Sequence, residues 1–258
     1  MSFGLYLKTS AIIILSMIVI SCNQSTTKEV TTQAPQKNEH TKIETPNTIK
    51  SSPRSTRVTI EKITSAQFER DKQNASLNKP VEKITDFKIV QKALEGIVIF
   101  EKLDGHLGIK KINFRNGITS DASYQLDECS FSTYFPEEDV LLLECGHTTD
   151  RSFDLKTGRD TYEVGNLNYI TTSLTGKYRL NKIFEGQECF NHFIQMKEKG
   201  KYQKVLDLNE IFKKKTGKWL CVIEKEFWTD DHTLYFGLVT QYKEEGNEYE
   251  FYKIKIVN

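Results

Sequence analysis

Three stretches of this chain differ in how apolar and polar residues follow one another. Residues 11–20, AIIILSMIVI, are almost wholly apolar, and residues 23–57 are polar with a few aliphatic residues that show no period. From about Val58 onward, apolar and polar residues alternate over short runs that Gly, Asn and Asp interrupt. Alternation with a period of two is typical of half-buried strands. The pattern therefore predicts a mainly β domain over residues 58–258.

The candidate strands are short, and tight turn sequences join several of them into hairpins. The candidates are Gly96–Glu101, Leu107–Phe114, Ser130–Phe135, Val140–Glu144, Ser152–Leu155, Tyr178–Ile183, Cys189–Met196, Tyr202–Leu206, Trp219–Ile223, Thr233–Thr240 and Tyr249–Ile256. The turns are Leu103-Asp104-Gly105, Lys156-Thr157-Gly158, Glu198-Lys199-Gly200 and Glu245-Gly246-Asn247. We expect a single domain built as an antiparallel meander of hairpins.

Helical spacing is scarce and predicts one or two short helices. Ile84, Phe87, Val90 and Leu94 lie near helical spacing, with Thr85 or Asp86 as a cap and Gly96 just beyond. The second candidate is a short turn around Leu208–Lys215 that closes at Gly217.

Three local phrases resemble those of β-propeller blades. "SLTGKY" (173–178) resembles the turn into a blade strand, "FDLKTGR" (153–159) an outer hairpin, and "WTDDHTLYF" (228–236) the start of another blade. The same phrases suit any antiparallel meander, because tight turns between twisted strands favour the same residues. A small propeller-like arrangement is therefore the alternative fold.

The amino-terminal residues have the layout of an export signal. Lys8 precedes an apolar run of about ten residues, roughly 15 Å as a helix, which is too short to cross a hydrocarbon core of about 30 Å. A charged start, a short apolar region and a small residue at the cut define a signal peptide, here residues 1–21.

The end of this signal, Val19-Ile20-Ser21-Cys22, resembles the lipobox of bacterial lipoproteins. Ile20 is bulkier than the residue usual at its position. The resemblance implies diacylglycerol on the Cys22 sulfur, cleavage before Cys22 and acylation of the new amine. Two or three acyl chains give a stable anchor at about 0.8 kcal/mol per buried CH₂. The alternative is ordinary cleavage that leaves Cys22 as a free thiol.

Residues 22–57 read as a lipid-anchored disordered tether. They are rich in Thr, Lys, Glu, Gln, Asn, Ser and Pro, and cannot bury enough apolar surface to offset the entropy of ordering. A flexible coil of this length reaches about 30 Å. Removal of residues 1–21 takes away Lys8 and no acid, so basic side chains fall from 36 to 35 and equal the acidic ones. This balance gives no long-range attraction to nucleic acid.

Four cysteines lie in the predicted domain: Cys129, Cys145, Cys189 and Cys221. An even count in an exported chain favours disulfides. If Phe135 faces Asp139 across a three-residue turn, Cys129 falls opposite Cys145, which leaves Cys189 with Cys221. The two other pairings, and buried free thiols, remain alternatives, because a slip of one residue moves partners to opposite faces.

Candidate chemistry centres on His147 and His192. Glu144 and Asp150 lie near His147, and Glu188 lies near His192, so an acid–base pair could form. Ordinary solvated polar groups at strand ends are the simpler interpretation. The sequence holds no Gly-x-Ser-x-Gly elbow, no Gly-rich phosphate loop and no paired Cys-x-x-Cys, so we expect no cofactor or metal.

We therefore expect an envelope lipoprotein, exposed outside the cytoplasm and held at a membrane by its acyl anchor. Its expected role is non-enzymatic binding or scaffolding with a protein or glycan partner. One alternative is an envelope hydrolase with a site near His147, Glu188 and His192. The other is a tethered inhibitor or immunity-type protein.

Overall fold

The computed structural model describes most of the chain from Thr56 onward. The described residues are 56–75, 77–103, 106–146, 148–186 and 188–257. The predicted signal peptide, Cys22 and nearly all of the predicted tether lie outside them, as do His147 and two residues of the turn at 103–105.

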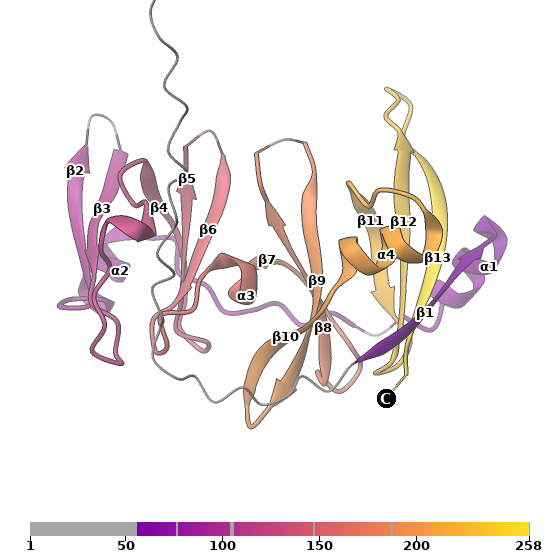
Figure 1. Ribbon diagram of the computed structural model, residues 1–258, viewed down its shortest axis with the longest axis horizontal. Coiled ribbons are helices and arrows are strands. Elements are labelled where there is room, and N and C mark those ends of the chain that lie inside the picture. The colour runs from indigo at the N-terminus through magenta and orange to yellow at the C-terminus, as the bar shows by residue number, and fades with distance from the viewer. Residues whose placement is uncertain (1–55, 76, 104–105, 147, 187, 258) are drawn as a thin grey trace, which may run out of the picture. The chain divides into compact units, whose positions relative to one another are not determined.

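The described chain is mainly β, with thirteen strands in three antiparallel sheets (Figure 1). Sheet I contains β2 (Val98–Leu103), β3 (His106–Ile112), β4 (Cys129–Phe135), β5 (Val140–Cys145) and β6 (Thr149–Asp154). Sheet II contains β7 (Asn166–Thr172), β8 (Tyr178–Phe184), β9 (Phe190–Glu198) and β10 (Lys201–Asp207). Sheet III contains β11 (Ile223–Trp228), β12 (Thr233–Gln241), β13 (Glu248–Val257) and β1 (Arg57–Ile63).

Each sheet follows the order of the chain, apart from β1. Sheets I and II are meanders of consecutive strands, and β1 pairs with β13 along its whole length, from Arg57 opposite Val257 to Ile63 opposite Phe251. Consecutive antiparallel strands are also the connectivity of a propeller blade, but closed propellers take four or more blades. The predicted meander of hairpins is thus confirmed, with three blade-like sheets among the described residues.

Two observed strands were not predicted, and one predicted strand is misplaced. β1 and β7 were not expected, and the predicted strand Trp219–Ile223 is wrong because β11 begins only at Ile223. The segment before Ile223 is held by a helix and is not part of a strand. The side-chain amide of Asn209, in the helix Leu208–Thr216, donates to the Leu220 carbonyl at 2.8 Å.

The described residues form four short α-helices, where the pattern predicted one or two. α2 (Phe87–Ala93) and α4 (Leu208–Thr216) are the expected ones, while α1 (Ser65–Lys72) and the single turn α3 (Thr161–Val164) are additional. The Asp86 carboxylate caps α2 by accepting from the Ile89 amide (3.1 Å). Asp207 caps α4 in the same way, and Gly217 ends it in the left-handed conformation (φ 72°).

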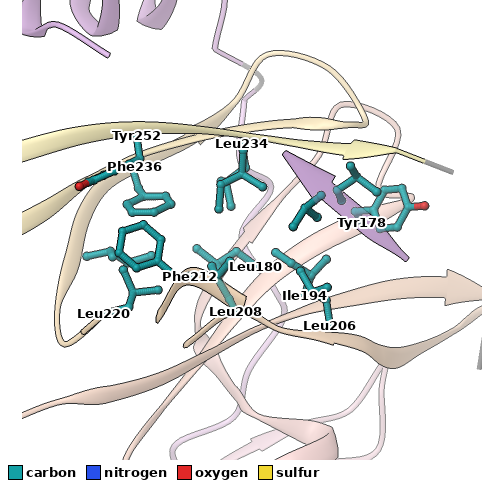
Figure 2. Close-up of a cluster of buried hydrophobic side chains, with 14 of the residues drawn as sticks. Tyr178, Leu180, Ile194, Leu206, Leu208, Phe212, Leu220, Leu234, Phe236 and Tyr252 are labelled. Carbon is teal, nitrogen blue, oxygen red and sulfur yellow. The ribbon is translucent and has the colours of Figure 1, made fainter. Parts of the chain in front are cut away.

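The largest core cluster joins sheets II and III. Figure 2 shows Leu234, Phe236 and Tyr252 on one side of this layer, with Leu180, Ile194 and Leu206 on the other. α4 adds Leu208 and Phe212, and the Phe212 ring meets Tyr252 edge to face at 4.9 Å. Because side chains alternate along β12 and β13, the opposite face of sheet III is also apolar, and α1 covers it with the fully buried Phe68.

Sheet I has its own hydrophobic core, which α2 covers. The Cys129–Cys145 disulfide belongs to this core and links β4 to β5. Cys189 is bonded to Cys221, so the structure has the pairing that the hairpin register predicted. The assumed turn, however, is wrong: Phe135 pairs with Val140, and Asp139 stays in a four-residue turn at φ 56°. A bulge between Phe131 and Thr133 shifts the register back by one, which returns Cys129 to a position opposite Cys145.

A buried arginine ties sheet II to the β4–β5 turn of sheet I. The Arg179 side chain on β8 is 2% exposed and binds both carboxylate oxygens of Glu138, at 2.6 and 3.0 Å. Its Nε donates to Gln195 Oε1 (2.6 Å), and its guanidinium lies 3.8 Å from the centre of the Tyr202 ring. Such a bidentate pair fixes distance and orientation together. The contact therefore fixes the β4–β5 turn against β8.

Candidate functional site

A cleft of about 390 Å³ lies where β5 and β6 of sheet I meet β7 and the β8–β9 pair of sheet II. We call it the aromatic cleft. Its polar and aromatic lining residues are Ser132, Glu144, Thr148, Asp150, Asn166, Asn168, Tyr169, Phe184 and Phe190. The volume is within the range of small-molecule sites in proteins.

Two carboxylates face each other across the hairpin on one wall of the cleft. Glu144 on β5 is directly opposite Asp150 on β6, a cross-strand position that is unfavourable for like charges. Burial raises the pKa of the Asp150 carboxyl, the Glu144 charge adds to the rise, and hydrogen bonds from Asn166 and the Phe184 amide oppose it. The Phe184 amide donates to Asp150 Oδ2 at 2.9 Å, so β8 holds this carboxylate in place.

Three rings form the other wall. Tyr169 and Phe190 lie at 87° to each other with ring centres 5.5 Å apart, and Phe184 lies 5.2 Å from Phe190. Tyr169 is 41% exposed, which is high for a tyrosine between two sheets. Burial and then the charges of Asp150 and Glu144 raise the pKa of its hydroxyl. The Tyr169 ring and the two carboxylates therefore share one environment.

The irregular path of β7 places Tyr169 in the cleft. Pairing with β8 breaks between Asn166 and Thr171, so the intervening residues are released from the regular ladder. The Asn166 side chain accepts from the Asn168 amide (2.9 Å), which holds the chain in a local turn. Asn168 and Tyr169 thereby reach the cleft.

The lining defines the chemistry that the cleft can accept. Among the described residues that line it there is no lysine or arginine, while two carboxylates and three rings are present. One basic group approaches from outside: the Lys83 ammonium binds Asn168 Oδ1 at 2.9 Å. The cleft is thus anionic and aromatic, with amide groups at its edge.

His192, predicted as a candidate for acid–base chemistry, lies in the interior. It is fully buried, and its Nδ1 lies 3.0 Å from Asn209 Oδ1. The Asn209 amide nitrogen donates to the carbonyls of Phe190 and Leu220, so its oxygen is the acceptor and Nδ1 carries the proton. Burial, and next the Lys182 charge, lower the pKa of His192 to about 3. The imidazole is therefore neutral and has no surface for a substrate.

The other residues of the predicted acid–base site do not form a common site with the buried His192 in the described part of the chain. Glu188 is exposed in the β8–β9 connection with φ 63°, and His147 lies outside the described residues. Glu144 and Asp150, noted in the sequence as neighbours of His147, are the two that the fold brings together. Within the described residues no group of three His, Cys, Asp or Glu side chains could hold a metal ion.

The burial of His192 predicts an acid-sensitive fold. Its pKa is depressed in the folded state, so its contribution to stability is complete above the unfolded value of about 6.5 and declines as the pH falls toward 3. We expect it to account for about 2 kcal/mol of the loss in unfolding free energy between about pH 7 and pH 5. Urea denaturation at both pH values measures this loss.

His192→Asn is the matched variant, because its side-chain amide keeps a donor near Asn209 and does not titrate. The loss between the two pH values should be smaller in the variant by that amount. An equal loss in both proteins would show that His192 is protonated inside the fold.

Sequence reasoning missed Asn166, Asn168, Tyr169, Phe184 and Phe190 as site residues. The segment NLNYITT has alternation that could have indicated β7, but it stands beside no predicted turn. Phe184 directly follows the predicted strand Tyr178–Ile183, Phe190 lies near the start of the predicted strand Cys189–Met196, and nothing local distinguishes the two rings from core residues. Only the meeting of two sheets makes these positions neighbours.

No described helix is both long and apolar enough to cross a membrane. Comparison with family models, with curated proteins and with solved structures finds no match to this chain.

Proposed function

We propose that this chain is an envelope lipoprotein that is held at a membrane through Cys22 and binds a ligand without catalysing a reaction. The observation that carries the proposal is the use of cysteine. Four of the five cysteines form two disulfides, and the fifth, Cys22, stands at the end of the lipobox-like segment. Disulfides persist in oxidising compartments, which supports export of the domain.

The position of the first strand is compatible with such an anchor. β1 begins at Arg57, so about 35 residues separate Cys22 from the fold. As a flexible coil they reach about 30 Å, which is enough to hold the domain clear of lipid headgroups. The anchor would then fix the location of the domain without constraining its orientation.

Binding, in place of catalysis, is favoured by the state of the candidate acid–base groups. His192 is neutral and buried, and it lies beside Asn209 in the interior. The aromatic cleft is open and lined by groups that suit recognition. We propose the cleft as the site that holds the ligand.

The anchor is tested by replacing Cys22 with alanine and fractionating cells that express the full chain. We expect the unchanged protein in the membrane fraction and Cys22→Ala in the soluble fraction, because the variant lacks the sulfur that would be acylated. Ser25→Ala, which leaves Cys22 in place, is the control and should stay with membranes.

Mass spectrometry of the amino-terminal peptide gives an independent readout. An acylated peptide that begins at Cys22 supports the proposal. An intact peptide that begins at Met1, or membrane retention of Cys22→Ala, contradicts it.

A further inference from the structure

The aromatic cleft combines two features that point to one class of ligand. Its hairpin wall carries two carboxylates at directly opposite positions, Glu144 and Asp150, and its lining has no lysine or arginine among the described residues. Two like charges at such a position repel each other unless a cation lies between or beside them. A ligand that carries positive charge would relieve this repulsion.

The charge of Asp150 is also set apart from solvent. Its Oδ2 accepts from the Phe184 amide at 2.9 Å, and the residue is half-buried. Burial and the negative charge of Glu144 both favour the neutral carboxyl, so both raise the pKa of Asp150. A cation in the cleft favours the ionised form instead.

The aromatic rings of the cleft also favour a positively charged organic ligand. Tyr169 and Phe190 stand at 87° to each other, so they present two walls of different orientation, and Tyr169 is 41% exposed. Aromatic faces attract ammonium groups through the ring quadrupole, and also cover the apolar substituents on nitrogen. A bare metal ion would use the carboxylates alone, whereas an organic ammonium uses both walls.

We propose that the aromatic cleft binds an organic ammonium group, with Glu144 and Asp150 as its counter-charges and Tyr169 as the main ring contact. The inference rests on the proposed role of the cleft as a binding site. A free amine and a lysine side chain of a partner protein offer the same chemistry, so the test includes both.

The test uses the full-length chain in detergent and titration calorimetry with matched probes. Choline is compared with its neutral isostere 3,3-dimethylbutan-1-ol, and Nα-acetyl-lysine methylamide represents a partner's side chain. N-acetylglucosamine represents a neutral saccharide. We expect choline or the lysine derivative to bind at least about tenfold more tightly than the isostere, because these two probes carry the positive charge that the isostere lacks.

Three variants locate the site. Glu144→Gln removes an exposed charge, and Tyr169→Leu removes the ring while keeping an apolar side chain. Each should weaken ammonium binding about tenfold or more. Tyr242→Leu, at a tyrosine that is 63% exposed and does not line the cleft, should leave binding unchanged.

The outcomes separate this inference from the wider proposal. Binding of the isostere as tightly as both ammonium probes, or binding of the saccharide alone, would overturn the ammonium inference and leave the cleft as a binding site. Absence of binding by every probe would overturn both the inference and the role of the cleft. The Cys22 experiments decide the membrane anchor separately.

Discussion

Replacing Glu138 with alanine is expected to lower the free energy of unfolding by about 3–5 kcal/mol. Arg179 is the buried member of the pair, with 2% of its side chain exposed against 27% for Glu138. Without the carboxylate, the partners left to the guanidinium among the described residues are the Gln195 oxygen and the Tyr202 ring. A buried cation that has lost its counter-charge is strongly unfavourable. Urea denaturation monitored by circular dichroism measures the change.

The same asymmetry predicts the result of a double-mutant cycle. Arg179→Met removes the buried charge and keeps an apolar stem, while Glu138 can be rehydrated because it is partly exposed. Arg179→Met should therefore be less damaging than Glu138→Ala. The double variant should be more stable than Glu138→Ala alone, because no unpaired charge remains inside.

Lys243→Ala is the control, since Lys243 and Glu248 form an exposed ion pair at the surface of sheet III. We expect a change of about 1 kcal/mol or less. If Glu138→Ala costs no more than this control, Arg179 is not confined to the interior and the tie between sheets I and II is weaker than described.

Removing the two disulfides is the second change with a large expected effect. Cys189 and Cys221 are 32 residues apart, and Cys129 and Cys145 are 16 apart. From the entropy of loop closure in the unfolded chain, Cys189→Ala/Cys221→Ala should cost about 4 kcal/mol and Cys129→Ala/Cys145→Ala about 3 kcal/mol. Guanidinium denaturation of each double variant and of the unchanged protein measures the two losses in unfolding free energy and shows which is larger.

Reduction of the unchanged protein provides the matched control. With both bonds open, its unfolding midpoint should fall below that of either double variant, since each variant retains one disulfide. If reduction leaves the midpoint unchanged, the four cysteines are not paired in the folded protein, and the main support for export is lost.

Local sequence patterns were sufficient to predict most of the hairpins, but not the pairing of strands that are far apart in the sequence. Alternation and turn residues placed most of the strands within a few residues, and the cap residues Asp86 and Gly217 correctly marked two helix ends. β1 was missed because its partner lies about 200 residues away, and its own neighbours are polar. Single-strand patterns carry no record of such a distant partner.

The Cys129–Cys145 pairing shows how two local errors can cancel. The assumed three-residue turn is one residue too short, and the bulge between Phe131 and Thr133 restores the register. Asp139 was not recognised as a turn residue with positive φ, although its carboxylate binds Arg115 (2.7 Å) and the Tyr134 hydroxyl (2.9 Å). Those contacts offset the backbone strain and come from parts of the chain that a turn pattern does not include.

The candidate site was only half visible in the sequence. Glu144 and Asp150 attracted attention through His147, yet their significance comes from the rings of Tyr169 and Phe190 on another sheet. His192 looked reactive because of its neighbours in sequence, and the packing against Asn209 makes it a core residue. Burial by distant segments is what local composition cannot report.

The pairing of β1 with β13 has a consequence for biogenesis. During synthesis or translocation β1 emerges first, but its hydrogen-bonding partner is made about 200 residues later. Until then the β1 segment lacks the strand that pairs with it in the fold and is open to pairing with other chains. Sheet III can therefore be completed only after β13 has followed, and any factor that escorts the nascent protein would have to shield β1 throughout that delay.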